Sequence, residues 1–412
     1  MTGGNLRINE DRLWSRLMRS AEIGTGEAGG LKRLALTEED AAMRRQLVAW
    51  AEADGFPVSI DQAGNIFIRL SGREELPPVL VGSHLDTQVA GGRFDGILGV
   101  LAGFEVIQSL KEAGIIPKRP IEVVNWANEE GARFAPPMMA SAVFAGVQSL
   151  DWLYERTDDD GVTYGEALAA TGFRGDEPVG GRALDSYFEL HIEQGPLLQE
   201  NDRPLGIVTG GYTVHGMVIR LTGETAHTGP TPMDQRRNAL VGAAMIAAAT
   251  NEIGLAYAPI GKATAARLVA WPNKPGILSS WAEVTVDVRH EDPAVAEAMR
   301  SDLQQAIVRS AERARVEAEI VSTWYFGDEV FDADCNALVR EAAERLGVPH
   351  MEIKSQAGHD AYYLSRVAPT ALLFSPCVDG ITHNEREDVP FAETMAASNV
   401  LLHAVMARAE RD

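Results

Sequence analysis

The order of predicted strands and helices changes near residue 213 and changes back near residue 330. Before the change, apolar runs typical of buried strands alternate with helical segments, the pattern of an α/β sheet with helices on both faces. The predicted strands are 77–83, 120–125 and 186–192, with a helix over 96–113, helices within 7–54 and a hairpin near 58–70.

Between residues 213 and 329 the predicted order is βαββαβ, which is typical of a small ferredoxin-like α+β domain. Residues 281–290 alternate strictly, so Ala282, Val284, Val286 and Val288 point to one side and the polar residues to the other. The predicted strands are 213–222, 264–271, 279–289 and 316–323, and the helices 233–252 and 293–314.

After residue 330 the α/β character resumes, with a predicted helix over 334–346 and a buried strand over 370–374. We therefore predict a discontinuous mixed-sheet domain of residues 1–212 and 330–412. Residues 213–329 form an inserted second domain, and a chain of 412 residues is long enough for both.

Charge and cysteine content exclude several classes of protein. The chain has 37 basic and 59 acidic residues, a net charge of −22, which disfavours nucleic acid and anionic membranes as partners. A substrate carboxylate would need a local cationic anchor. Two cysteines are too few for a disulfide framework, which favours a reducing compartment. No apolar segment typical of a secretion signal follows Met1, and the apolar runs are too short to span a membrane. We therefore expect a cytoplasmic protein.

Four polar clusters lie at the ends of predicted strands, where open α/β sheets bind ligands. Imidazoles and carboxylates are the usual ligands of zinc and related metals. One such residue alone is more often structural, but together they indicate a metal site. The residues are His84, Asp86 and Asp95 in GSHLDT and GGRFDG, Glu129 and Glu130 in NEEG, His191 in HIEQGP, and His383 in ITHNE.

In this order, together with HTGPTPM and GHDA, the motifs resemble a family of metal-dependent amidohydrolases. The family includes N-carbamoyl-L-amino-acid hydrolase, β-ureidopropionase and allantoate amidohydrolase, which are related to metallo-aminoacylases and carboxypeptidases. The resemblance covers about residues 10 to 410. It implies two divalent metal ions per subunit (zinc, or manganese, cobalt or nickel) in a catalytic domain, and an inserted lid and dimerisation domain.

The resemblance also implies a role for each metal-site residue. His84 and His383 would each bind one metal, Asp95 would bridge the two, and Glu130 and His191 would complete the pair. Asp86 would accept a hydrogen bond from His84, and Glu129 would be the general base. A histidine at position 191, where peptidases tend to have an acidic residue, favours the carbamoyl and ureido branch.

The remaining implied roles concern the substrate. His227 would stabilise the oxyanion from the partner subunit's lid, which implies a homodimer. Arg289 and Asn273 would hold a substrate carboxylate, and Arg289 supplies the cationic anchor, although it could instead form a surface salt bridge. Gln194 and Gly358 would line the same site.

Three departures from the family pattern lie in the lid and leave the substrate open: Pro230 in TGPTPM, Asn238, and residues 274–280. An N-carbamoyl-L-amino acid is the first expectation. Allantoate, N-carbamoyl-β-alanine and N-acyl amino acids are alternatives, as is a peptidase. A non-catalytic protein that binds a ureido or amide ligand is a further alternative, which the retained Glu129 disfavours.

Overall fold

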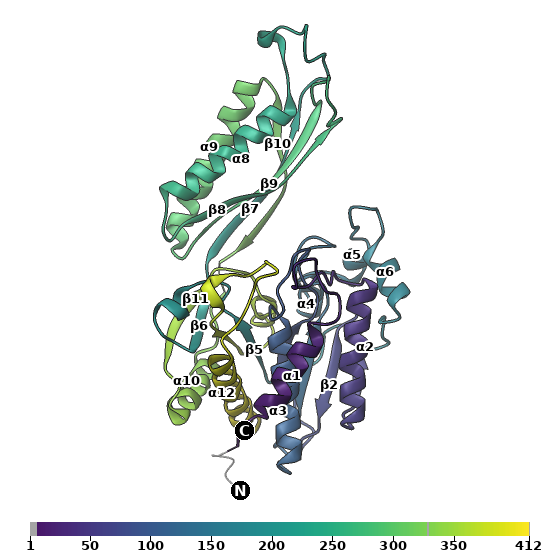
Figure 1. Cartoon of the computed structure of the whole chain (residues 1–412), viewed down its shortest axis with the longest axis vertical. Helices are drawn as coiled ribbons and strands as arrows, with labels where there is room; N and C mark the ends of the chain where they lie inside the picture. The colour runs from purple at the N-terminus through teal and green to yellow at the C-terminus, as the bar shows by residue number, and fades with distance from the viewer. Residues whose placement is uncertain (1–5, 328, 412) are drawn as a thin grey trace. The chain divides into compact units, whose positions relative to one another are not determined.

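The computed structural model describes residues 6–327 and 329–411, which form two compact units (Figure 1). The larger unit takes the chain up to Thr209, then Val330–Ile353 and the residues from Gly358 onward. The smaller unit is Gly210–Glu329 with Lys354–Ala357. The fold is therefore mixed α/β, as predicted.

An eight-stranded mixed sheet organises the larger unit. Its strands β3, β4, β5 and β12 are parallel, whereas β1, β2 and β6 pair antiparallel with their neighbours. In sheet order the strands are β1 (Val58–Ile60), β2 (Ile66–Leu70), β4 (Ile121–Trp126), β3 (Val79–His84), β5 (Ser186–Ile192), β12 (Thr370–Ser375), β6 (Leu205–Gly211) and β11 (His350–Ser355).

Helices cover both faces of this sheet. On β5, Phe188, Leu190 and Ile192 enter the main hydrophobic core together with side chains of α3 and α12. Glu189 of the same strand points the other way and accepts a hydrogen bond from the backbone N–H of Ala361 in α11. The helices are α1 (Glu10–Ser20), α2 (Glu38–Ala53), α3 (Ile97–Glu112), α4 (Met139–Phe144), α5 (Leu150–Tyr154), α6 (Tyr164–Thr171), α7 (Leu197–Glu200), α10 (Ala333–Leu346), α11 (Asp360–Leu364) and α12 (Phe391–Ala409).

The smaller unit is an antiparallel sheet in the order β10–β7–β9–β8 with two helices packed on one face. The predicted alternation of β9 is confirmed, since Ala282, Val284, Val286 and Val288 all enter this unit's core. The elements are β7 (Thr213–Thr222), η1 (Met233–Gln235), α8 (Ala239–Ala256), β8 (Lys262–Trp271), β9 (Trp281–His290), α9 (Pro293–Ala314) and β10 (Glu317–Phe326).

The predicted start of the helix at residue 233 is wrong. Met233–Gln235 form one 3₁₀ turn and Arg236 is extended, so α8 begins only at Ala239. The guanidinium of Arg236 donates to the carbonyl oxygens of Thr228 and Thr231, which stabilises the extended backbone.

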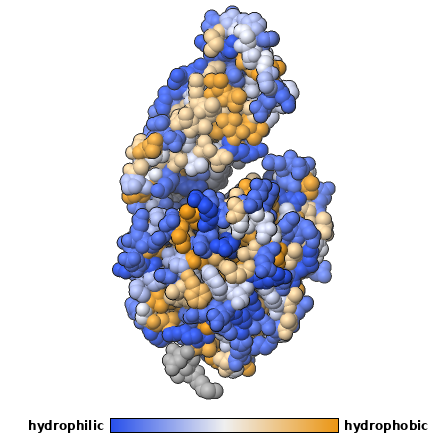
Figure 2. Space-filling model, viewed as in Figure 1, coloured by the Kyte–Doolittle hydropathy of each residue, from blue (hydrophilic) through white to orange (hydrophobic). Residues whose placement is uncertain are grey.

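Helix α8 is unusually apolar for a helix so little covered. Among the described residues it is the one helix long and apolar enough to cross a membrane by length and composition, with 28% of it buried. Ala239, Ala243 and Ile246 pack into the core of the smaller unit, whereas Val241 and Leu255 are exposed. Figure 2 shows apolar side chains gathered on the face of this unit over α8.

Candidate metal centre

The four predicted clusters each follow one of the parallel strands β3, β4, β5 and β12. His84 is the last residue of β3, and His191 lies one residue before the end of β5. Since the carboxyl ends of parallel strands meet at one edge of the sheet, the clusters converge there. The structure brings together all five predicted metal ligands in two overlapping groups.

The first group is His84, Asp95 and His191, all buried. Asp95 Oδ1 lies 3.1 Å from His191 Nε2 and 3.7 Å from His84 Nε2. The Nδ1 atoms of both histidines lie 2.9 Å from main-chain oxygens, those of Asp86 and Ile192. A ring whose Nδ1–H donates to a carbonyl oxygen presents Nε2 as the metal ligand.

The second group is Asp95, Glu130 and His383. His383 Nε2 lies 3.4 Å from Asp95 Oδ2 and 3.3 Å from Glu130 Oε2. His383 lies in the loop after β12 with a φ of 48°, and its side chain is 47% exposed. The two oxygens of Asp95 therefore face different groups, as a bridging carboxylate must.

Burial and charge act in opposite directions on the pKa values of these residues. Burial alone would raise the pKa of Asp95, but His191 and His383 outweigh it and hold that pKa well below its usual value. Burial would likewise lower the pKa of His191, yet Asp95 raises it to about 9. The carboxylates at this site therefore stabilise positively charged imidazoles. They would stabilise bound divalent cations in the same way.

Glu129 lies beside the first group rather than in it. Its Oε2 is 3.4 Å from His84 Nε2, and the residue is 7% exposed. Burial, followed by the charges of Asp360 and Glu130, raises the pKa of Glu129 well above its usual value. A carboxyl group with a raised pKa next to a metal site has the properties of a general base.

Asp86 accepts the hydrogen bond of His84 as predicted, but with its main-chain oxygen and not with its carboxylate. The Asp86 carboxylate does not accept the hydrogen bond of His84, since its nearest oxygen is 3.9 Å from Nδ1 and the main-chain oxygen is nearer. Instead it accepts the backbone N–H groups of Glu129 and Glu130, at 3.1 and 3.2 Å. Burial raises the pKa of Asp86 to about 8, although both amides oppose the shift.

The donor atoms fit a pair of divalent transition-metal ions. Three imidazole nitrogens and the carboxylates of Asp95 and Glu130 form the two groups, with no thiolate among their ligand residues. This set suits zinc, manganese, cobalt and nickel alike.

Several polar residues around the ligands have no counterpart in the sequence prediction. Gln88 donates from Nε2 to Glu130 Oε2 at 2.9 Å. Thr382 and Glu387 contact Asp95, and burial, followed by the charge of Asp95, raises the pKa of Glu387 to about 8. Gln88 and Glu387 are ordinary polar residues in loops, so the sequence carries no signal for them, whereas Thr382 lies in the ITHNE motif next to His383.

Two predicted substrate residues lie near the same centre. Gln194 Nε2 donates to Asp95 Oδ2 at 2.9 Å, and its Oε1 is buried with no hydrogen-bond partner among the described residues. Gly358 lies against Met138, where a Cβ atom would come within 2.7 Å of the methionine Cε. The next residue, His359, packs edge-on against His191 with ring centroids 4.4 Å apart.

The other predicted substrate residues belong to the smaller unit. His227 is exposed, and its Nδ1 accepts the backbone N–H of Gly229 at 3.0 Å. Asn273 is exposed with a φ of 46°. Arg289 donates from Nε and Nη2 to the two oxygens of Asp287, at 2.8 and 3.1 Å, so it forms the local salt bridge that the sequence left open.

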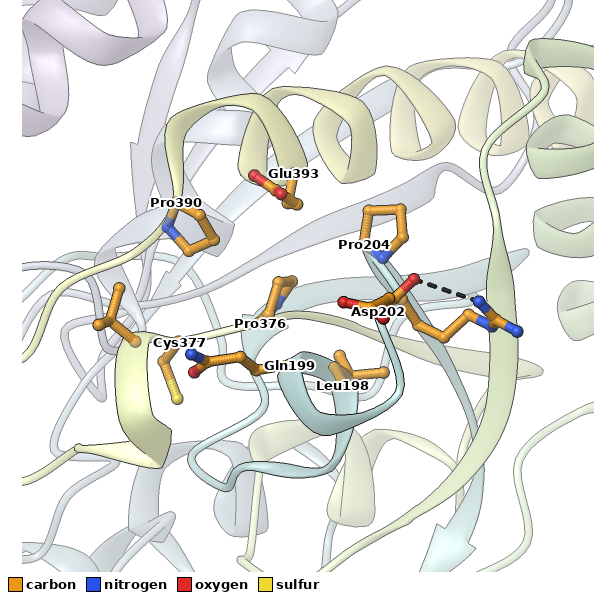
Figure 3. Close-up of a pocket in the computed structure, with 10 residues that line it drawn as sticks. Leu198, Gln199, Asp202, Pro204, Pro376, Cys377, Pro390 and Glu393 are labelled. Carbon is orange, nitrogen blue, oxygen red and sulfur yellow. Dashed lines mark hydrogen bonds between the residues drawn. The ribbon is translucent and has the colours of Figure 1, made fainter.

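A cavity of about 320 Å³ lies beside the loop that carries His383 (Figure 3). Leu198 and Gln199 of α7 form one wall, and Pro376, Pro390 and their neighbours form the others. No predicted site residue lines it, so it is distinct from the metal centre.

Residues 80–407 match the peptidase family M20/M25/M40. The chain belongs to the peptidase family M20/M25/M40. Members of this family are metal-dependent enzymes, in agreement with the two ligand groups at the sheet edge.

The relatives of this chain include proteins named as N-carbamoyl-L-amino-acid amidohydrolases and as allantoate amidohydrolases. The chain is 42% identical to the N-carbamoyl-L-amino-acid amidohydrolase of Rhizobium meliloti, over 99% of this chain and 98% of the relative. It is 32% identical to the allantoate amidohydrolase of Bacillus subtilis, over 89% and 90%. A crystal structure of an amidase of the hydantoinase/carbamoylase family from Burkholderia vietnamiensis has a TM-score of 0.96 and 47% identity, covering 99% of both chains.

Proposed function

We propose that this enzyme hydrolyses the C–N bond of an N-carbamoyl-L-amino acid and releases the amino acid, carbon dioxide and ammonia. The observation that carries the proposal is Asp95, whose two oxygens face two separate groups of ligands while Glu129 lies next to His84. The carbamoyl specificity is supported by the relative from Rhizobium meliloti.

His84, Asp95 and His191 would hold one divalent ion, and Asp95, Glu130 and His383 the other. A bound pair supplies Lewis acidity, which lowers the pKa of water and polarises a carbonyl group. The main-chain oxygens of Asp86 and Ile192 orient two of the histidines toward this pair.

Glu129 would remove a proton from the attacking water and deliver it to the leaving nitrogen. Its raised pKa suits both halves of this transfer, because a strongly acidic carboxyl group would hold the proton too weakly. Asp86 fixes the backbone of Glu129 and Glu130 together, so the base and a metal ligand keep a constant separation.

Gln194 supports a ureido rather than an N-acyl substrate. Its buried Oε1 is an acceptor without a partner among the described residues. The terminal NH₂ of a ureido group is a donor that an N-acyl group lacks, and satisfying a buried acceptor is favourable. In the smaller unit, Arg289 would bind the substrate carboxylate, and His227 would stabilise the oxyanion. Asn273, which was predicted to hold the same carboxylate, lies at the opposite end of the sheet from Arg289, because Trp271 pairs with Trp281 whereas Arg289 pairs with Lys262.

We also propose a homodimer formed through the smaller unit, in the cytoplasm. Strand β8 is an edge strand whose side chains are largely exposed, and the neighbouring α8 exposes Val241 and Leu255. A long unprotected edge beside an apolar helix favours association with a second copy. The two cysteines are free thiols, as in proteins of a reducing compartment.

The first experiment measures ammonia release from N-carbamoyl-L-amino acids, N-carbamoyl-β-alanine and allantoate, and amino-acid release from N-acyl amino acids and dipeptides. The protein is stripped with a chelator and assayed with and without Mn²⁺, Zn²⁺ or Co²⁺. Metal-dependent turnover of N-carbamoyl-L-amino acids is the expected result. Turnover of allantoate or an acyl compound alone would reassign the substrate, and no turnover with metal bound would favour a ligand-binding protein.

A further inference from the structure

Glu387 is a buried carboxylate on the loop that carries His383, and it reaches the turn that carries Asp95. Its Oε1 accepts the backbone N–H groups of Phe94 at 2.9 Å and Asp95 at 3.1 Å. Two hydrogen bonds to one carboxylate oxygen thus join segments 292 and 293 residues apart in the sequence.

The turn that carries Asp95 is shaped to receive this carboxylate. A Cβ atom at Gly92 would lie 1.9 Å from Glu387 Cδ and 2.0 to 2.1 Å from its two oxygens. Such contacts are impossible, so the carboxylate occupies the space that any side chain at position 92 would fill.

Thr382 connects the same carboxylate to the side chain of Asp95. Its Oγ1 lies 3.0 Å from Glu387 Oε2 and 2.9 Å from Asp95 Oδ2. Asp95 Oδ2 is the oxygen that faces His383, at 3.4 Å. Glu387 therefore contacts both the backbone of Asp95 and, through Thr382, the oxygen directed at the second ligand group.

We propose that Glu387 is a positioning residue that holds Asp95 and His383 at the separation required by the second metal ion. The inference rests on the proposed metal pair. His383 lies in a loop with a half-exposed side chain, so the loop needs an anchor to the turn of Asp95 to be preorganised. The histidines of the first ligand group depend less on such an anchor, because His84 and His191 lie in strands of the sheet.

The test is calorimetric titration of the chelator-stripped full-length chain with Co²⁺ alone. Wild type should bind two equivalents. In Glu387→Ala the affinity for one equivalent should fall by about 10–100-fold, as is usual when a partner of a metal ligand is removed. Glu387→Gln should stay close to wild type, because its carbonyl oxygen still accepts both amides and its NH₂ still reaches Thr382.

Glu385→Ala is the matched control, since Glu385 lies in the same loop but binds the backbone N–H groups of Ala28 and Gly30. It should retain both equivalents. Thr382→Val provides a second variant in case Glu387→Ala does not fold, and the same equivalent should weaken. The positioning role alone would be overturned if folded Glu387→Ala or Thr382→Val bound two equivalents of Co²⁺ with wild-type affinity. It would also be overturned if Glu385→Ala lost as much affinity for Co²⁺ as Glu387→Ala. A wild type that binds fewer than two equivalents would overturn the proposed metal pair as well.

Discussion

The Nδ1 atom of His84 lies 2.9 Å from the main-chain oxygen of Asp86, while the nearest carboxylate oxygen of Asp86 is 3.9 Å away. The backbone therefore orients His84, and the carboxylate is free to hold the amides of Glu129 and Glu130. The Asp86 side chain acts on the base and on a metal ligand rather than on the histidine.

We expect Asp86→Ala to lower the free energy of unfolding by about 1–3 kcal/mol for each buried N–H that it leaves without an acceptor. Turnover should fall as well, because Glu129 loses its fixed position. Asp86→Asn keeps one acceptor oxygen and should lose less. Urea unfolding and kcat measure the two effects, and a variant with wild-type values for both would refute this role of the carboxylate.

Substitution of Glu129 should separate catalysis from metal binding. Glu129→Gln keeps the shape of the side chain but cannot accept a proton, so kcat should fall by about 10²–10⁴-fold with the metal content unchanged. Glu130→Gln is the comparison, since it should lose metal from the second group. Metal content by elemental analysis and kcat under saturating substrate distinguish the two. Near wild-type kcat in Glu129→Gln would remove this residue as the base.

The candidate metal centre was predictable because the residues that could bind metal follow apolar runs. His84 is the last residue of β3 and His191 lies one residue before the end of β5, so each follows an apolar run, and that change from apolar to polar residues is visible in the sequence. The partners of the ligands were not predictable in the same way. Glu387 is a polar residue in a polar loop, and its contacts lie nearly 300 residues away, at Phe94 and Asp95.

Helix α12 could not be predicted from the pattern of apolar residues in the sequence. It packs between the sheet and other helices, so Val400, Leu401, Leu402, Ala404 and Val405 are buried in succession. A helix covered on most sides has no polar face and hence no 3.6-residue pattern to detect. Strand β9 is the opposite case, because one face is buried and the other polar, and the prediction of its alternation is confirmed.

Arg289 should contribute to substrate affinity more than to the chemical step. Arg289→Ala is expected to raise KM about tenfold or more for substrates with a carboxylate, with a smaller change in kcat. Lysine should not restore KM, since it cannot reproduce the planar fork that binds Asp287. Arg220→Ala is the control, as Arg220 forms a comparable salt bridge with Glu283 on the same sheet. An unchanged KM in Arg289→Ala would contradict the assignment.

Asp61 gives a pH dependence that is independent of the metal centre. Burial raises the pKa of Asp61 to about 6 from the usual 3.8. Between these values the folded protein holds a proton that the unfolded chain has released, so the free energy of unfolding falls as pH rises through this window. Asparagine at position 61 cannot ionise, so the stability of Asp61→Asn does not follow this titration. The free energy of unfolding of the variant minus that of wild type should therefore rise by about 2 kcal/mol between about pH 4 and 7. Urea unfolding at both pH values tests this, and a constant difference would contradict the raised pKa.

The proposed dimer makes a prediction about mixed subunits, because His227 would act on the partner's metal centre. Glu129→Gln and His227→Ala should each be nearly inactive alone. When the two variants are unfolded together and refolded as a mixture, about half of the dimers are mixed. Each mixed dimer has one site with an intact Glu129 and an intact His227, so activity should recover to about a quarter of wild type.

Leu255→Glu tests the same interface directly. Leu255 is 64% exposed on α8, and a charge there should prevent an apolar contact between two copies. The variant should sediment as a monomer with low turnover.

In the mixing experiment, pairing Glu129→Gln with Glu130→Gln is the control, because both changes lie in the same metal centre and no mixed dimer has an intact site. Recovery in that control, or none with His227→Ala, would show that His227 does not act across subunits.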